Sequence, residues 1–203
     1  MKPKRIVIDA GHGGTDPGAV GWVPHSPDIA PKREVDQALA IAAAVAAELD
    51  RRGYDVVMTR TADRYMQLQE RVMFVNALKP QAALVISLHR DAAASANAQG
   101  LTVFYNNMGN KPSVRGKRLA EILQRHLVQR TGLTDRSARP RPAFRDGKQV
   151  ETSLAILRDT KPPAALVELG FMSHPTEELL ADDPNFRRSC ALAIAGAVDE
   201  YFR

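Results

Sequence analysis

The sequence predicts an α/β fold: a single-domain, three-layer sandwich in which a central twisted, mostly parallel sheet of about six strands is flanked by helices. Short apolar runs alternate with longer segments of helical periodicity, which is typical of parallel sheets with crossover helices. The 203 residues, 44% hydrophobic and 25% charged, have the length and composition of one globular domain. We therefore expect residues 1–203 to form one unit.

The candidate strands are short runs bounded by polar residues or glycine, as expected for a buried sheet. They are residues 5–9, 54–59, 83–88, 101–105, 154–157 and 165–169. The candidate helices carry apolar residues at helical spacing, and Gly53 and Gly132 follow two of them as stop signals. They are residues 35–52, 69–78, 113–130 and 184–201.

Two stretches do not fit a helix or a strand. Residues 22–32 contain three prolines, which predicts a loop. Residues 137–148 combine prolines with four basic residues, which predicts an exposed basic excursion.

Charge and cysteine content exclude several classes of protein. With 28 Lys and Arg against 23 Asp and Glu, the net charge of +5 favours anionic partners. Cys190 is the single cysteine, which excludes an intrachain disulfide framework and a cysteine-based zinc finger. No apolar run approaches the roughly 18 residues of a membrane span. The start of the chain lacks the apolar core of a secretory signal, so we expect no signal peptide in this chain.

Polar residues gather where three predicted strands end. The first strand runs into Asp9 and a turn containing His12, the third into His89, and the last contains Glu168. Ligands of parallel α/β sheets bind beyond the carboxyl ends of the strands, so we expect these side chains to meet. Glu34, at the start of the first helix, is a further candidate.

Each of these residues also has a purely structural interpretation. A glycine-rich turn such as that around His12 often only reverses the chain, and a histidine ending an apolar strand is often a satisfied core residue. Glu34 is favourable at a helix start because of the helix dipole, and Glu168 could pair with an arginine. Together, however, two histidines and one carboxylate make the ligand set of a catalytic zinc site, with a second carboxylate as general base.

Four segments in order resemble the zinc-dependent N-acetylmuramoyl-L-alanine amidases of the amidase 3 family. They are Ile-Val-Ile-Asp-Ala-Gly-His-Gly-Gly at 6–14, Arg-Glu at 33–34, Ser-Leu-His at 87–89 and Leu-Val-Glu-Leu-Gly-Phe-Met-Ser at 166–173. The resemblance covers nearly the whole chain. It implies that His12, Glu34 and His89 bind Zn²⁺, that Glu168 is the catalytic glutamate, and that the substrate bond is the amide between N-acetylmuramic acid and the L-alanine of the stem peptide.

Other residues near the predicted site are weaker candidates. Arg90 stands where the family has a small residue, and we expect Arg90, Asp91 and Arg158 to contact substrate. Asp9 or Asp91 are the candidates for orienting an imidazole. The 79 residues from His89 to Glu168 are fewer than we expect in members of the family that carry a long inhibitory helix over the zinc. The resemblance therefore implies an open site, unless Glu151 folds over it.

The resemblance implies peptidoglycan as partner. From the sequence we also expect no nucleic-acid partner, no membrane span and a monomeric chain. We expect one catalytic amidase domain without a separate wall-binding domain, acting on the bacterial cell wall from the periplasm or outside. A phage-type lysin and a mature or excised catalytic domain both fit a chain without a signal peptide. Two alternatives stay open: a zinc peptidase acting on stem peptides, and a non-catalytic basic protein that binds the wall or nucleic acid through residues 137–148.

Overall fold

The computed structural model describes residues 3–21, 31–106, 113–141 and 154–203, and the backbone of residues 143–145 and 148–150. The predicted loop around Trp22 and the predicted role of Glu151 therefore fall largely outside the described residues. Within the described ranges, no helix is both long enough and apolar enough to cross a bilayer.

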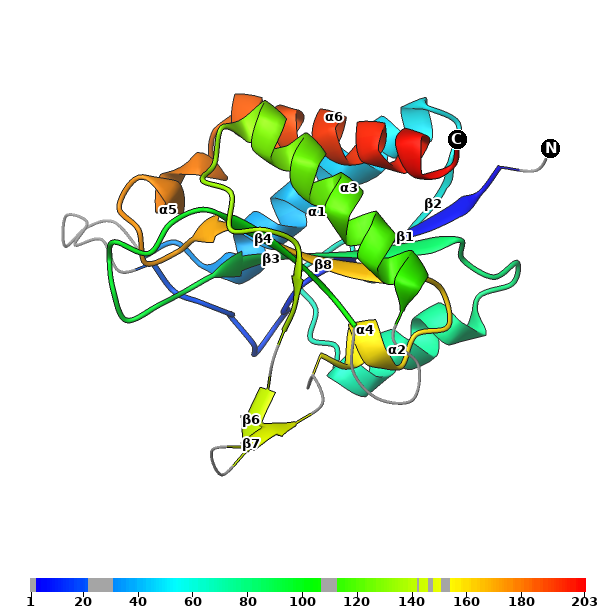
Figure 1. The fold of residues 1–203 in the computed structure, drawn as a ribbon, viewed down its shortest axis with the longest axis horizontal. Helices are drawn as coiled ribbons and strands as arrows, with labels where there is room; N and C mark the ends of the chain where they lie inside the picture. The colour runs from blue at the N-terminus through cyan, green and yellow to red at the C-terminus, as the bar shows by residue number, and fades with distance from the viewer. Residues whose placement is uncertain (1–2, 22–30, 107–112, 142, 146–147, 151–153) are drawn as a thin grey trace.

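The fold is an α/β sandwich, as predicted. Its main sheet has six strands in the order β2-β1-β3-β8-β4-β5. These are β1 (Arg5–Ala10), β2 (Asp55–Met58), β3 (Leu84–Asp91), β8 (Ala164–Phe171), β4 (Leu101–Tyr105) and β5 (Arg139–Pro140). All neighbours run parallel except β4 and β8, which are antiparallel. A separate hairpin of β6 (Ala143–Arg145) and β7 (Lys148–Val150) projects away from the body of the molecule (Figure 1).

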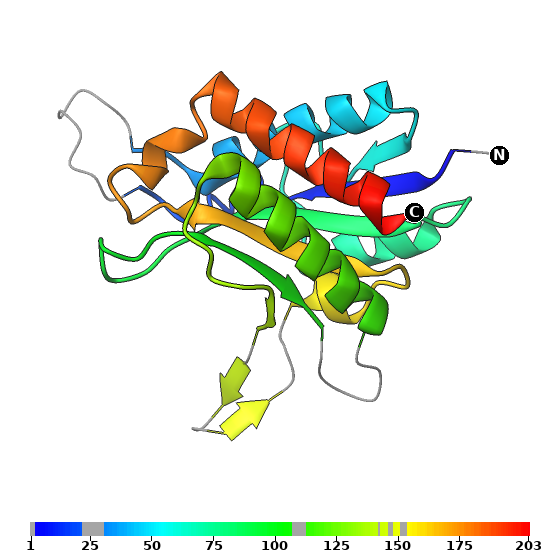
Figure 2. The ribbon, with the colours of Figure 1, turned by 45° about the horizontal axis from the view of Figure 1, so that its top comes forward.

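Helices cover both faces of this sheet (Figures 1 and 2). One face carries α1 (Glu34–Arg51), α3 (Val114–Thr131) and α6 (Pro184–Tyr201), whereas α2 (Leu68–Ala77) and α4 (Ala155–Arg158) lie on the other. A short helix, α5 (Glu177–Leu180), follows β8. The four long predicted helices match α1, α2, α3 and α6 to within one residue at each end.

Side-chain alternation along the strands divides the interior into two cores. Ile6, Ile8, Ile86 and Leu88 pack with α1, α3 and α6. On the other face Val7, Val85, Phe104 and Leu166 pack with α2 and α4. Because successive strand residues point to opposite faces, each polar residue near a strand end is assigned to one of these two faces by its parity.

One predicted strand is wrong. Residues 154–157 are not in the sheet; they form the N-terminal part of the short helix α4, and Ala155, Ile156 and Leu157 are buried. A four-residue apolar run fits a buried strand and a buried helical turn equally well, so periodicity could not separate them. The sixth strand is β5, which pairs with β4 inside the stretch predicted to be an exposed basic excursion.

Candidate metal centre and its supporting network

Three side chains, from the turn after β1, from α1 and from β3, meet at one point on the α2 and α4 side of the sheet. Oε1 of Glu34 lies 2.9 Å from Nε2 of His12 and 2.9 Å from Nδ1 of His89, and the two nitrogens are 3.2 Å apart. Four-coordinate zinc with bonds of about 2.0–2.2 Å holds its ligand atoms at similar separations. The structure thus brings together the three residues that the sequence singled out as metal ligands.

The local backbone is shaped to admit these rings. His12 has a positive φ of 59°, which aims its imidazole from a tight turn after β1. A Cβ at Gly11 would lie 2.3 Å from Cε1 of His89, and one at Gly18 would lie 2.6 Å from Oε2 of Glu34. Only residues without a side chain fit at these two positions, because the backbone approaches the cluster so closely.

The charges in the cluster suit a cation. Burial would raise the pKa of Glu34, but hydrogen bonds to the imidazoles of His12 and His89 hold that pKa well below its ordinary range. The donor set is one ionised carboxylate and two imidazoles, with room for a fourth ligand, which is the chemistry of a catalytic zinc site. The residues present therefore fit a zinc ion.

Asp16 orients His12, although the sequence did not single out this residue. Oδ2 of Asp16 lies 2.9 Å from Nδ1 of His12, which leaves Nε2 to face the cluster. Asp9 and Asp91, the residues expected to orient an imidazole, do not do so. Asp9 instead accepts hydrogen bonds from Thr59, Ser87 and Arg71. Two backbone hydrogen bonds close the turn between Gly13 and Asp16. No residue pattern in the sequence predicts these two hydrogen bonds.

Glu168 lies next to the cluster on the same face. In the register of β3 and β8 it is the partner of His89, and both residues line one cavity of about 410 Å³. Glu168 is 7% exposed, and its buried Oε2 has no hydrogen-bond partner among the described residues. Burial raises the pKa of Glu168 to about 7, with His89 opposing and the carboxylates of Asp91 and Glu34 adding to the rise.

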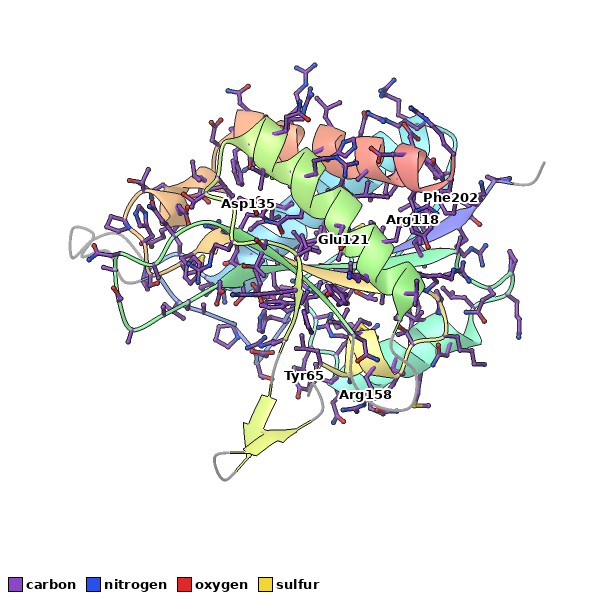
Figure 3. All side chains as sticks on the ribbon, viewed as in Figure 1. Tyr65, Arg118, Glu121, Asp135, Arg158 and Phe202 are labelled. Carbon is purple, nitrogen blue, oxygen red and sulfur yellow. The ribbon has the colours of Figure 1, made fainter. Side chains whose placement is uncertain are left out.

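The three weaker candidates for substrate contact are placed differently. Asp91 is half-buried at the end of β3 and lines the cavity, and burial raises its pKa. Arg158 is the last residue of α4 (Figure 3), binds Asp159 at 2.6 Å and lines a different cavity. The structure therefore does not bring Arg158 to the cluster.

The expectation for Arg90 is corrected. Arg90 follows His89 in β3 and points to the opposite face, where it is 2% exposed. Its guanidinium donates hydrogen bonds to Oε1 of Gln37 at 2.7 Å and to the backbone carbonyl of Glu177. Only its backbone N–H reaches the cluster, at 3.0 Å from Oε1 of Glu34. The guanidinium is thus unavailable to a substrate.

Two buried arginines hold the turn that carries His12. Arg60 donates to the carbonyls of Ala10 and Gly11, at 3.0 and 2.6 Å. Arg71 donates to the carbonyls of Ala10 and His12, and its Nη1 binds Oδ1 of Asp9 at 2.7 Å. Three consecutive carbonyls are thereby fixed by two guanidinium groups.

Removing Arg71 is expected to destabilise the protein strongly. Arg71→Ala leaves the buried Asp9 carboxylate without its cation, which costs about 3–5 kcal/mol of the free energy of unfolding. Urea unfolding followed by circular dichroism measures the change. Arg130→Ala, at an exposed position in the last turn of α3, is the matched control and should lie within about 0.5 kcal/mol of the wild type. Equal stabilities of the two variants would contradict the assignment.

Known proteins are similar to this chain in sequence and in fold. A family model described as N-acetylmuramoyl-L-alanine amidase matches residues 6–200. Probable cell wall amidases named LytH, from Staphylococcus epidermidis and Staphylococcus aureus, are 32% identical over 202 residues, which is 100% of this chain and 60% of theirs. The chain therefore spans about 60% of the length of these curated relatives.

Solved structures agree with this match. An N-acetylmuramoyl-L-alanine amidase from Clostridium difficile 630 superposes with a TM-score of 0.84 at 27% identity, over 100% of this chain and 98% of that chain. The catalytic domain of CwlV, from Bacillus (Paenibacillus) polymyxa var. colistinus, gives a TM-score of 0.82 at 30% identity, over 98% of both chains. By the family model and by these relatives, the chain belongs to the N-acetylmuramoyl-L-alanine amidase family.

Proposed function

We propose that this chain is a zinc-dependent peptidoglycan amidase that cleaves the bond between N-acetylmuramic acid and the L-alanine of the stem peptide. The observation that carries the proposal is the convergence of His12, Glu34 and His89 beside the buried carboxylate of Glu168, in a chain of this family. The peptidoglycan substrate also suits the net charge of +5, because bacterial walls carry anionic groups.

Each residue of the site has a defined task in this proposal. His12, Glu34 and His89 would hold the zinc ion, and Asp16 keeps His12 in the tautomer that presents Nε2. When bound there, a zinc ion would supply the Lewis acidity that polarises a carbonyl and activates water. Glu168 takes the proton from the attacking water and delivers it to the alanine nitrogen, since an amine without that proton is a poor leaving group.

Product analysis tests the proposal directly. Purified peptidoglycan is digested with the zinc-loaded protein and, in parallel, with Glu168→Gln, and the soluble products are identified by mass spectrometry. We expect stem peptides with a free L-alanine amino terminus from the wild type alone. Shortened peptides still attached to sugar would indicate a peptidase instead. Salt-sensitive binding to the wall without any product would indicate a binding protein.

The pH dependence of kcat/KM is expected to show a limb governed by Glu168. The raised pKa of about 7 means that the carboxylate loses its proton, and becomes a base, as the pH rises through neutrality. A bound cation lowers this pKa. We therefore expect kcat/KM to decrease as the pH falls below an apparent pKa of about 7 or less. Rates measured between about pH 5 and pH 9, with zinc content checked at each point, test this. A kcat/KM that rises as the pH falls through that range, with zinc retained, would contradict it.

A further inference from the structure

The cavity beside the metal centre extends well past the four residues of the proposed reaction. Besides the cluster it is lined by an apolar wall that includes Met66, Leu68, Leu154 and Ile156, which lie at or just before the first turns of α2 and α4. Its volume of about 410 Å³ lies within the range of sites for small ligands. A ligand that reaches the metal centre therefore has further atoms to place against this wall.

Three arginines line this cavity, and the guanidinium groups of two of them are already bound to other residues of the protein. Arg71 is paired with Asp9, and the guanidinium of Arg90 lies on the opposite face of the sheet. Arg141 is different: it is exposed, and within the described ranges its guanidinium has no carboxylate partner. It is therefore the cation that the described part of the chain leaves available to a ligand at this cavity.

The position of Arg141 is fixed by the strand that precedes it. Phe104 and Tyr105 of β4 pair in register with Arg139 and Pro140 of β5, and Arg141 follows immediately. The Arg141 guanidinium lies over the Phe104 ring, 5.6 Å from its centroid, at a distance typical of a cation–π contact. Phe104 belongs to the core on the face that carries His89 and Glu168. A guanidinium held in this way loses little freedom when it binds a ligand.

The surrounding charges indicate what Arg141 contributes. Asp91 and Glu168 also line the cavity, and Arg141 lies close enough to lower the pKa of both carboxyl groups. A negatively charged ligand group would be repelled by these two carboxylates unless a cation received it. The planar guanidinium matches a carboxylate in geometry and can bind both of its oxygens.

We propose that Arg141 binds a carboxylate of the stem peptide at the edge of the cavity and makes the site prefer free-acid over amidated peptides. This inference rests on the proposed function, and it names a group on the substrate that the bond cleavage itself does not involve. Arg141 then determines which peptides are held against the apolar wall with their amide at the metal centre.

Two matched ligands and two neighbouring arginines test this role. The ligands are muramoyl tripeptides of one sequence, with all side-chain and terminal carboxylates either free or amidated. Their dissociation constants are measured by calorimetry with zinc-loaded Glu168→Gln protein, so that neither is cleaved, alone and combined with Arg141→Gln, Arg141→Lys or Arg139→Gln. Arg139 stacks on the same Phe104 ring at 5.7 Å but does not line the cavity, so it is the control.

We expect the parent protein to prefer the free acid by about 10- to 100-fold, as for a hydrogen-bonded ion pair. Arg141→Gln should remove most of this preference by weakening free-acid binding, Arg141→Lys should keep part of it, and Arg139→Gln should keep it all. Equal affinities of the parent protein for the two peptides would overturn the inference. So would an equal loss of affinity for both peptides in Arg141→Gln, since that would indicate a general structural role.

The failures of the two proposals are distinguishable. If the wild-type protein releases no peptide with a free L-alanine amino terminus, the proposed function is wrong, whatever the affinities are. If cleavage occurs but Arg141→Gln leaves the preference for the free acid unchanged, only the role of Arg141 is wrong. Thermal unfolding of each variant, compared with Arg139→Gln, shows whether the fold is retained.

Discussion

Glu168→Gln is expected to lower kcat by about 10²- to 10⁴-fold, the usual contribution of a general acid–base group, while the protein keeps its zinc. The amide has the shape of the carboxylate but cannot accept and return a proton. Glu168 is not one of the three residues of the metal cluster, so metal content should not change. Initial rates of amide cleavage and the zinc bound after dialysis are the two measurements.

The same variant is expected to be at least as stable as the wild type. Glu168 is buried with one carboxylate oxygen unpartnered among the described residues, and a neutral side chain avoids the cost of burying that charge. Glu121→Gln, on the exposed surface of α3 (Figure 3), is the matched control and should change neither rate nor metal content. Wild-type turnover by Glu168→Gln would contradict the catalytic role.

His12→Ala is expected to lose both zinc and turnover. The substitution removes one of three converging donor atoms, and the two that remain cannot complete the ligand set of a catalytic zinc site. Zinc affinity is measured by competition with a chromophoric chelator, and turnover by release of stem peptide. A His12→Ala protein that binds zinc as tightly as the wild type would show that the cluster is not the metal site.

Asp16→Asn is expected to weaken zinc binding less than His12→Ala does. Asp16 contacts His12 through Nδ1 and not through the nitrogen in the cluster, so all three donor atoms remain. Loss of a group that orients a metal-binding imidazole typically weakens metal affinity by about 10- to 100-fold. An intermediate affinity for Asp16→Asn would separate the orienting role of Asp16 from direct ligation by His12.

The repeating parts of the fold could be predicted from the sequence because their signals are local. The long helices carry apolar residues at a constant spacing and stop near glycine, so α3 and α6 were bounded to within one residue. Residues 154–157 were misassigned because four apolar residues have no measurable period. The strand β5 was missed because two residues, Arg139 and Pro140, join the sheet only through their pairing with β4.

In the candidate site, too, some features could be predicted from the sequence, whereas those that depend on contacts between distant residues could not. The convergence of His12, His89 and Glu168 followed from the rule that parallel strands end at one edge. The contacts of Arg60 and Arg71 with the His12 turn link residues about 50 to 60 positions apart. No short-range pattern in the sequence predicts such contacts. The direction of Arg90 was predictable: adjacent residues of a strand face opposite ways, so a neighbour of His89 within β3 could not share its face.

This opposition of His89 and Arg90 makes the chemistry of the site dependent on strand register. If β3 paired with β1 and β8 one residue out of step, every side chain along it would change faces. Arg90 would then take the place of His89 beside Glu34. Its guanidinium would occupy the space in which the three ligands hold the metal ion. The imidazole would be buried against α1, and Leu88 would face the cavity. The register that pairs Ile86 with Ile8 and Ala165 is thus a condition for the metal centre, because a sheet in the shifted register would not bring the three ligand side chains together.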